Sequence, residues 1–230
     1  MRILGIIPAR GGSKGIPNKN LKLLNDKPLL QYTIEAANKA KYLDELILSS
    51  EDENIISIAK ELGVKVPFIR PPHLATDTAG SLEVVQHAIH FYQQKKETYD
   101  AICLLQATVP FRTSADIDRA LEMFIKKKPD ALISVEKIPH QYNPHWAFKA
   151  DNENNLVIAT GDEKIIKRRQ ELPEAYVRDG AIYITRTEVI MDQNSFLGNK
   201  TAYIELNNPN SINIDTPEDW ERAEEIIKTL

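Results

Sequence analysis

The chain has 230 residues, of which 42% are hydrophobic and 27% charged, so it can bury a full core as one large domain or as a domain with an appendage. Its formal net charge of −4 argues against a nucleic-acid partner, which usually requires a basic face. The single Cys103 excludes an intrachain disulfide and a cysteine-rich zinc site. No apolar run approaches the roughly 20 residues that span a bilayer, and none forms a signal peptide. We therefore expect a soluble cytoplasmic protein with no membrane partner.

Short apolar runs alternate with helical patterns along the first part of the chain. The apolar runs are typical of strands buried on both faces of a sheet. They cover residues 3–9, 45–50, 64–69, 101–106 and 131–137. Helices are predicted over residues 28–40, 52–63, 80–94 and 114–127. Ser114 is the expected cap of the last of these helices, and Gly63 is expected to end the second.

The alternation fails between residues 138 and 178, a segment that we call the excursion. Its aromatic residues Tyr142, Trp146 and Phe148 need burial, which favours an ordered segment over a disordered linker.

Strand patterns return at residues 180–186 and 201–206, before a C-terminal helix with Thr216 as its expected cap. We therefore predict an α/β fold with a mostly parallel sheet flanked by helices. Residues 1–137 and 179–230 would form the core, and residues 138–178 the excursion.

A glycine-rich loop follows the first predicted strand. The stretch "IIPARGGSKGIPNKN" places Arg10, Lys14 and Lys19 among three glycines. Open α/β sheets bind ligands at the carboxyl ends of their strands, and glycines let backbone N–H groups approach phosphate oxygens closely. The loop is neither a Walker A loop nor a G-x-G-x-x-G motif. A solvated basic turn is the alternative, but clustered cations favour a small anionic ligand.

Five blocks of the sequence resemble, in the same order, the signature blocks of the acylneuraminate cytidylyltransferases, which make CMP-activated sialic acids and related nonulosonic acids. The blocks read "IPARGGSKGIPNKN", "RPPHLATDTAGS", "LLQATVPFRTSADI", "RRQELPEAYVRDGAIYI" and "INIDTPEDW". They extend over nearly the whole chain, which is therefore identified as a member of this family. The resemblance implies a Rossmann-like nucleotidyltransferase fold, CTP and a nonulosonic acid as substrates, Mg²⁺ as cofactor, and a homodimer formed through the excursion.

The resemblance also implies which residues bind the nucleotide. Arg10, Lys14 and Lys19 match the cations that hold the triphosphate and stabilise the departing pyrophosphate. Asn20 matches a position near the ribose.

Two further matches concern the base. Arg70 and Ser81 match positions around the cytosine, where a polar pocket can reject other bases. A helix cap is a second expected role for Ser81.

The acceptor acid is assigned in the same way. Gln106 matches the glutamine at the sugar, with a structural role as the alternative, whereas Arg112 is expected to form a structural ion pair. Arg169 matches an arginine that enters the neighbouring subunit's site and meets the sugar carboxylate. The chain departs from the usual "LLQPTSPLR" at Ala107, Val109 and Phe111, and "NPHW" replaces a segment like "HPLK". These departures leave acids other than N-acetylneuraminate open.

Asn213 and Asp215 are two positions apart, so on an extended segment their side chains point to the same face. Mg²⁺ takes oxygen ligands and keeps several waters. The family usually has aspartate at both positions. Asp215 is therefore the predicted metal ligand and Asn213 a weak or indirect one, with helix-start electrostatics as the alternative role of Asp215.

The predicted reaction is the attack of the acid's anomeric hydroxyl on the α-phosphorus of CTP, with release of pyrophosphate. Arg10, Lys19 and Asp215 are the predicted catalytic residues, and Asp215 or a water on the metal is the candidate general base. The alternatives are a nucleotidyltransferase that uses GTP or an eight-carbon 2-keto sugar acid, and a sugar-nucleotide-binding protein without turnover.

Overall fold

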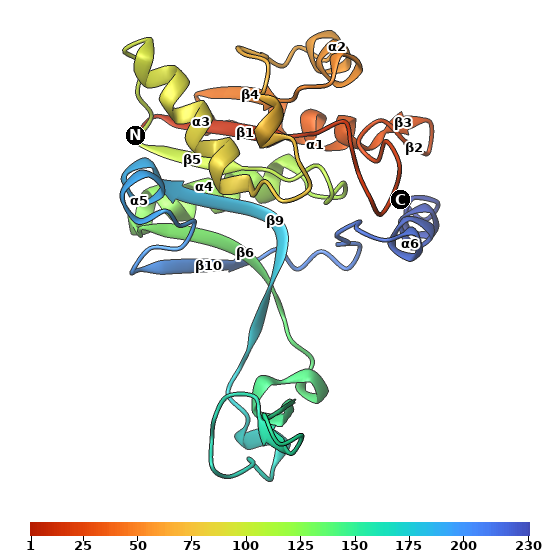
Figure 1. The fold of residues 1–230 in the computed structure, drawn as a ribbon, viewed down its shortest axis with the longest axis vertical. Helices are drawn as coiled ribbons and strands as arrows, with labels where there is room; N and C mark the ends of the chain where they lie inside the picture. Colours follow the sequence, from red (N-terminus) through yellow and green to blue (C-terminus); the bar gives the residue numbers. More distant parts are fainter. The chain divides into compact units, whose positions relative to one another are not determined.

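The computed structural model describes residues 1–230, which divide into two compact units. Unit 1 comprises Met1–Ser134 and Asp179–Leu230, and unit 2 comprises Val135–Arg178 (Figure 1). The excursion predicted at 138–178 lies within unit 2.

Unit 1 is built on a six-stranded sheet with the order β10–β6–β9–β5–β1–β4. These strands are β1 (Ile3–Pro8), β4 (Glu45–Ser49), β5 (Ala101–Leu104), β6 (Ala131–Lys137), β9 (Tyr176–Arg186) and β10 (Thr201–Glu205). β1 runs parallel to both of its neighbours, β4 and β5, whereas β9 runs antiparallel to β5. Two short strands, β2 (Leu23–Leu24) and β3 (Lys27–Pro28), form a separate antiparallel pair.

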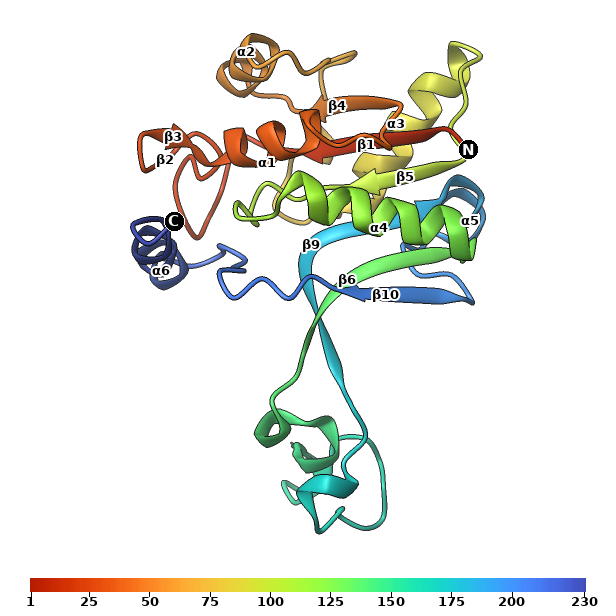
Figure 2. The ribbon, with the colours of Figure 1, turned by 180° about the vertical axis from the view of Figure 1, so that it is seen from behind.

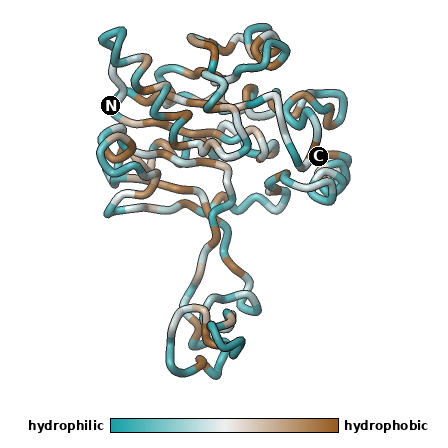
Figure 3. The backbone as a smooth tube through the Cα atoms, viewed as in Figure 1, coloured by the Kyte–Doolittle hydropathy of each residue, from teal (hydrophilic) through white to brown (hydrophobic).

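Helices cover both faces of the sheet (Figures 1 and 2). They are α1 (Leu29–Asn38), α2 (Glu53–Glu61), α3 (Ser81–Gln94), α4 (Ser114–Lys127) and α5 (Thr187–Gln193). α6 (Pro217–Ile227) packs instead in a third cluster with Leu24 and Leu29, and a short 3-10 helix, η1, lies at Pro72–Leu74. α1, α2 and α4 share one core cluster with Ile3 and Ile7, whereas α3 and α5 share another with Leu4 and Ile6. β1 is thus buried on both faces, as its apolar run predicts. The predicted α/β fold is confirmed. Figure 3 shows hydrophobic colour along β1 and the strands beside it.

Several local predictions differ from the structure. Residues 64–69 form no strand, because only Lys65 makes a bridge, to Ile47, and Pro67 lacks a backbone N–H. The predicted helix cap at Ser114 is wrong, since Thr113 caps α4 through a reciprocal pair of bonds with Asp116.

Of three further predictions about helix ends, one is wrong and two are confirmed. The cap expected of Ser81 is also wrong, because Gly80 is the N-cap of α3 and no side chain caps it. Thr216 does cap α6, with Asp219 as its reciprocal partner. Gly63 follows the end of α2 at φ +78°, as expected of a glycine that ends a helix. α5 was not predicted.

Unit 2 contains the antiparallel pair β7 (Phe148–Ala150) and β8 (Leu156–Ile158). It also contains three 3-10 helices, which are η2 (His140–Tyr142), η3 (Pro144–Trp146) and η4 (Arg169–Glu171). The half-buried Trp146 donates from Nε1 to the Ile166 carbonyl oxygen at 2.7 Å. Tyr142 and Phe148 remain exposed, at 69% and 50%. None of the helices in either unit has both the length and the apolar character needed to cross a bilayer.

Candidate active site

A cavity of about 230 Å³ opens in unit 1 where β1 and β5 end. Eight residues predicted from the sequence line it, and they come from separate parts of the chain: Arg10, Lys19, Asn20, Arg70, Ser81, Gln106, Asn213 and Asp215. Lys14 does not line the cavity, and its side chain is 80% exposed. Arg169 lies in unit 2, on η4.

The glycine-rich loop is held by contacts at several points. The Asn20 side chain donates from Nδ2 to the Arg10 carbonyl oxygen at 2.9 Å, which ties the end of the loop to its beginning. The Gly11 N–H donates to Glu51 Oε1 at 2.8 Å. A Cβ atom at Gly15 would lie 2.4 Å from the Asp215 carbonyl oxygen, so only glycine permits this approach. The loop therefore packs directly against the segment that carries Asp215.

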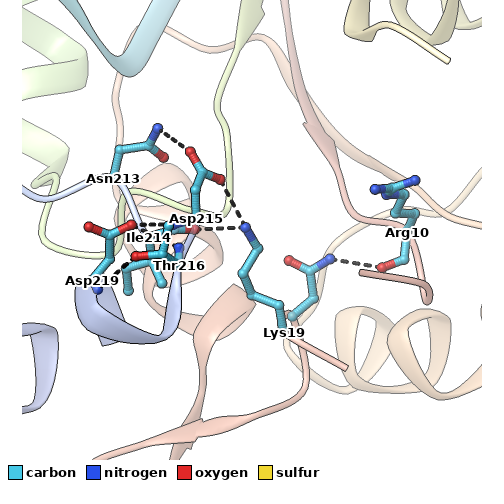
Figure 4. A network of polar contacts seen from close by, with 8 residues as sticks. Arg10, Lys19, Asn213, Ile214, Asp215, Thr216 and Asp219 are labelled. Carbon is cyan, nitrogen blue, oxygen red and sulfur yellow. Dashed lines mark hydrogen bonds and ion pairs between the residues drawn. The ribbon is translucent and has the colours of Figure 1, made fainter. Parts of the chain in front are cut away.

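Lys19 joins these two segments (Figure 4). Its Nζ donates to the Ile214 carbonyl oxygen at 2.7 Å and to Asp215 Oδ1 at 3.0 Å. Asn213 donates from Nδ2 to Asp215 Oδ2 at 2.9 Å, so both carboxylate oxygens of Asp215 accept hydrogen bonds. The Asp219 carboxylate accepts from the Asp215 N–H at 2.9 Å and from the Thr216 N–H at 2.8 Å. The start of α6 therefore fixes the backbone of Asp215, and Lys19 fixes its side chain.

The side-chain oxygens in this part of the cavity fit a magnesium site whose remaining ligands come from a bound substrate. Asp215 supplies one carboxylate and Asn213 one amide oxygen. Nowhere in the chain does a group of three or more His, Cys, Asp or Glu side chains gather to form a metal site. Mg²⁺ commonly binds through one or two carboxylates together with substrate phosphates and waters. This donor set therefore suits a magnesium ion that completes its coordination with a phosphorylated substrate.

The carboxylate of Asp77, which the sequence did not predict, lies against the cations of the loop. Arg10 Nη1 is 2.8 Å from Asp77 Oδ1, and Lys14 Nζ is 3.0 Å from Asp77 Oδ2. The hydrogen bond from Lys14, supported by the one from Arg10, holds the pKa of Asp77 below its usual value. No spacing rule predicts this contact, because the loop and Asp77 are far apart in the sequence.

Arg70 forms a fixed part of the cavity wall. Its Nε donates to Ser49 Oγ at 3.1 Å, and its Nη2 donates to the Ser49 carbonyl oxygen. Burial lowers the pKa of Arg70 to about 10, an effect that the nearby Glu51 carboxylate opposes. The guanidinium therefore remains charged at neutral pH, and the end of β4 holds it in place. Ser81, the first residue of α3, lines the same cavity.

The backbone of Gln106 is held by the buried side chain of Arg112. Arg112 Nη2 donates to the Gln106 carbonyl oxygen at 3.1 Å and to Thr33 Oγ1 at 2.8 Å, and Nη1 donates to the Ala181 carbonyl oxygen. The predicted ion pair of Arg112 is therefore wrong, because its partners are carbonyl and hydroxyl oxygens; one carbonyl lies just after β5 and the other within β9. Gly180, at φ +79°, approaches the Gln106 side chain so closely that a Cβ there would lie 3.1 Å from Oε1.

Arg169 lines a separate hollow of about 460 Å³, which unit 2 forms from its own residues. Lys137, His140 and Glu174 also line this hollow. The cavity of unit 1 is likewise lined only by residues of unit 1. Each of the two hollows thus contains a different subset of the predicted residues.

Comparisons with known proteins agree over nearly the whole chain. Residues 4–229 match the profile of the family described as "Cytidylyltransferase". The chain is 36% identical over 229 residues to CMP-N,N'-diacetyllegionaminic acid synthase of Legionella pneumophila, covering 99% of this chain and 97% of that protein. It is 36% identical over 228 residues to pseudaminic acid cytidylyltransferase of Campylobacter jejuni, with coverages of 99% and 97%. It is 32% identical over 223 residues to N-acylneuraminate cytidylyltransferase of Escherichia coli, covering 96% of this chain and 51% of that protein.

Solved structures with low sequence identity share the fold. The structure of CMP:2-keto-3-deoxy-manno-octonic acid synthetase complexed with CTP matches with a TM-score of 0.73 and 17% identity, covering 100% of this chain and 99% of that chain. The structure of 4-diphosphocytidyl-2C-methyl-D-erythritol synthase from Anaerococcus prevotii matches with a TM-score of 0.67 and 13% identity, covering 99% and 98%. Both matches support the nucleotidyltransferase fold of unit 1.

Proposed function

Because this chain belongs to the cytidylyltransferase family, we propose that it transfers CMP from CTP to the anomeric hydroxyl of a nonulosonic acid and releases pyrophosphate. Relatives that are named for such acids match it over nearly its full length. The observation that carries the proposal is the cavity of unit 1, which brings Arg10, Lys19 and Arg70 together with Asp215. A triphosphate requires such cations, and a metal ion requires such a carboxylate.

In this reaction the hydroxyl oxygen of the acid forms a bond to the α-phosphorus of CTP, its proton passes to a water molecule, and the bond from that phosphorus to the bridging oxygen breaks. Negative charge develops on the departing pyrophosphate, where Lys19 and Arg10 stabilise it. The side chain of Gln106 orients the acid, and Arg112 holds the backbone carbonyl of the same residue in place. Positioning and charge neutralisation supply most of the acceleration in such a transfer. Each oxygen of Asp215 accepts one hydrogen bond and keeps a further lone pair, so we assign Asp215 to metal binding.

The substrates are tested by measuring pyrophosphate release from a panel of nucleotides and acids. We expect release with CTP and a nonulosonic acid, and little with GTP or with an eight-carbon acid. Since relatives named for legionaminic and pseudaminic acids are equally similar to this chain, the panel needs both acids as well as N-acetylneuraminate. Preference for GTP or for the eight-carbon acid would overturn the assignment. Binding of CTP without turnover of any acid would favour the non-catalytic alternative.

We also propose Mg²⁺ as cofactor, held by Asp215 and more weakly by Asn213. When bound, the ion would neutralise phosphate charge during the transfer. The position of Asn213 allows a specific test. Asn213→Asp is expected to lower the Mg²⁺ concentration that gives half-maximal rate, because a second carboxylate adds negative charge beside the ion.

The measurement is a magnesium titration of the initial rate at saturating CTP, together with magnesium binding in the presence of CTP alone. Asn210→Asp is the matched control, since it adds the same charge to the same loop but Asn210 does not line the cavity. A half-maximal concentration that stays constant or rises in Asn213→Asp would contradict the role of this position.

The assembly that we propose is a homodimer in which Arg169 completes the partner's active site. Unit 2 exposes several large apolar side chains, among them Tyr142 at 69%, Phe148 at 50% and Leu156 at 72%. Exposed apolar groups of this kind mark interaction surfaces, and a two-fold axis would allow two copies to cover each other. The guanidinium of Arg169 suits the carboxylate of the acid. A cytoplasmic location, with the buried Cys103 kept reduced, accords with this reaction.

Mixing two inactive variants tests the shared site. Arg169→Ala and Lys19→Ala are each expected to have low activity alone. In a heterodimer with shared sites, one site carries both lesions and the other carries none, so activity should return on mixing. Subunit exchange is verified by co-purification through a tag on one variant. If exchange occurs and no activity returns, Arg169 acts within its own chain or not at all.

A further inference from the structure

Asp77 lies in the loop between η1 and α3, and this loop forms part of the cavity wall. Its neighbours Thr76, Ala79 and Gly80 line the cavity. The carboxylate of Asp77 contacts Arg10 through one oxygen and Lys14 through the other. Both cations belong to the set that the resemblance assigns to the triphosphate. Asp77 therefore occupies the donors that an incoming nucleotide needs.

A carboxylate and a phosphate make the same demands on these side chains. Both accept charge-assisted hydrogen bonds from arginine and lysine. Without an anion, the like charges of Arg10 and Lys14 would repel each other on the loop, and Asp77 offsets this repulsion. The contacts are also easy to exchange, because the side chains of Asp77, Arg10 and Lys14 are 38%, 31% and 80% exposed, and solvent-exposed ion pairs are weak.

We propose that Asp77 is an internal stand-in for the nucleotide's phosphates. Its carboxylate keeps Arg10 and Lys14 in place while the site is empty, and it competes with triphosphate and with pyrophosphate for both cations. Binding of CTP displaces it, and its return helps pyrophosphate to leave. Asp77 acts through the two cations, so it is a positioning residue rather than a catalytic one. This inference rests on the proposed function.

The test measures equilibrium binding of CTP and of pyrophosphate by titration calorimetry, without an acceptor acid and therefore without turnover. The variant is Asp77→Asn, which keeps the size of the side chain and removes its charge. We expect Asp77→Asn to bind both ligands about fivefold more tightly than the wild type, since two weak competing ion pairs are lost. The difference should shrink at high salt, which screens exposed charges. A merely structural lesion would weaken binding instead.

Two further variants complete the design. Glu122→Gln removes one negative charge from the exposed surface of α4, away from the cavity, and should leave both affinities unchanged. Asp77→Glu restores a carboxylate and should return the affinities toward those of the wild type. In steady-state kinetics, Asp77→Asn should lower KM for CTP without raising kcat, because release of pyrophosphate becomes slower.

The outcomes separate this inference from the proposed function. Unchanged or weaker binding by Asp77→Asn would overturn the role of Asp77, even if the wild type is an active cytidylyltransferase. A wild type that binds CTP and pyrophosphate but transfers no CMP would overturn the proposed function, whereas tighter binding by Asp77→Asn would still support the competition. A wild type that binds neither ligand would overturn both.

Discussion

Replacing Lys19 by alanine is expected to lower kcat/KM for CTP by at least about tenfold, which corresponds to roughly 1.4 kcal/mol of transition-state stabilisation. The side chain of Lys19 is only 12% exposed, and its ammonium is held at 3.0 Å from Asp215 Oδ1 in the wall of the cavity. The substitution removes a fixed positive charge where the pyrophosphate develops negative charge. It also releases the Asp215 carboxylate from one of its two hydrogen-bond donors.

Lys22→Ala provides the matched control. Lys22 lies three residues after Lys19, but its ammonium lies over the Trp220 ring, 4.1 Å from the centroid, and it does not line the cavity. The comparison uses initial rates of pyrophosphate release over a range of CTP concentrations, with circular dichroism to verify folding. If the folded Lys19→Ala protein has the nucleotide kinetics of the wild type, Lys19 does not belong to the active site.

Replacing Arg112 by methionine is expected to lower the free energy of unfolding by about 3 kcal/mol, because buried acceptors would lose their donor. The carbonyl oxygens of Gln106 and Ala181 and the hydroxyl of Thr33 all accept from this guanidinium. Burial lowers the pKa of Arg112 to about 10, so the side chain is charged at neutral pH and its hydrogen bonds are charge-assisted. In a chain of this size the loss corresponds to a decrease in Tm of about 6–12 °C.

Thermal unfolding followed by circular dichroism measures this change, and Arg222→Met is its control. Arg222 is exposed on α6, so the same chemical substitution there should alter Tm by no more than a degree or two. Equal decreases in Tm in both variants would show that the buried contacts of Arg112 contribute no more to stability than an exposed arginine does. Because Arg112 also fixes the backbone of Gln106, we expect KM for the acid to rise more than KM for CTP in the folded fraction.

The strands were predictable where burial on both faces requires an uninterrupted apolar run. β1 and β5 are such strands, and β6 has the bounds that its pattern predicts, Ala131–Lys137. The pattern at residues 64–69 resembles a strand equally well but pairs only at Lys65, since pairing depends on a neighbouring edge that the local sequence does not describe. The caps of α3 and α4 were each predicted one residue too late, whereas that of α6 was correct. Ser114 and Thr113 are both good caps, and only the backbone geometry selects Thr113.

The cavity residues were predictable because the resemblance to a family supplied their roles, which composition and spacing do not. Contacts between those residues were harder to predict. The direction of two backbone carbonyls decides that Arg112 has no carboxylate partner, and the meeting of two distant loops decides that Asp77 pairs with Arg10. Such contacts depend on tertiary packing, so a single sequence contains no local signal for them.

The chain leaves unit 1 after Ser134 and re-enters it at Asp179, and these two points are neighbours, because the Ser134 hydroxyl donates to the Asp179 carboxylate. An insertion whose ends meet costs the host sheet only a short loop closure, so its interior can diverge, lengthen or shorten while β6 and β9 keep their register. If unit 2 carries both the subunit contact and the arginine for the acid, changes within this one insertion would alter the choice of partner and the choice of acid together. The nucleotide cavity would then be inherited unchanged by enzymes that act on different acids.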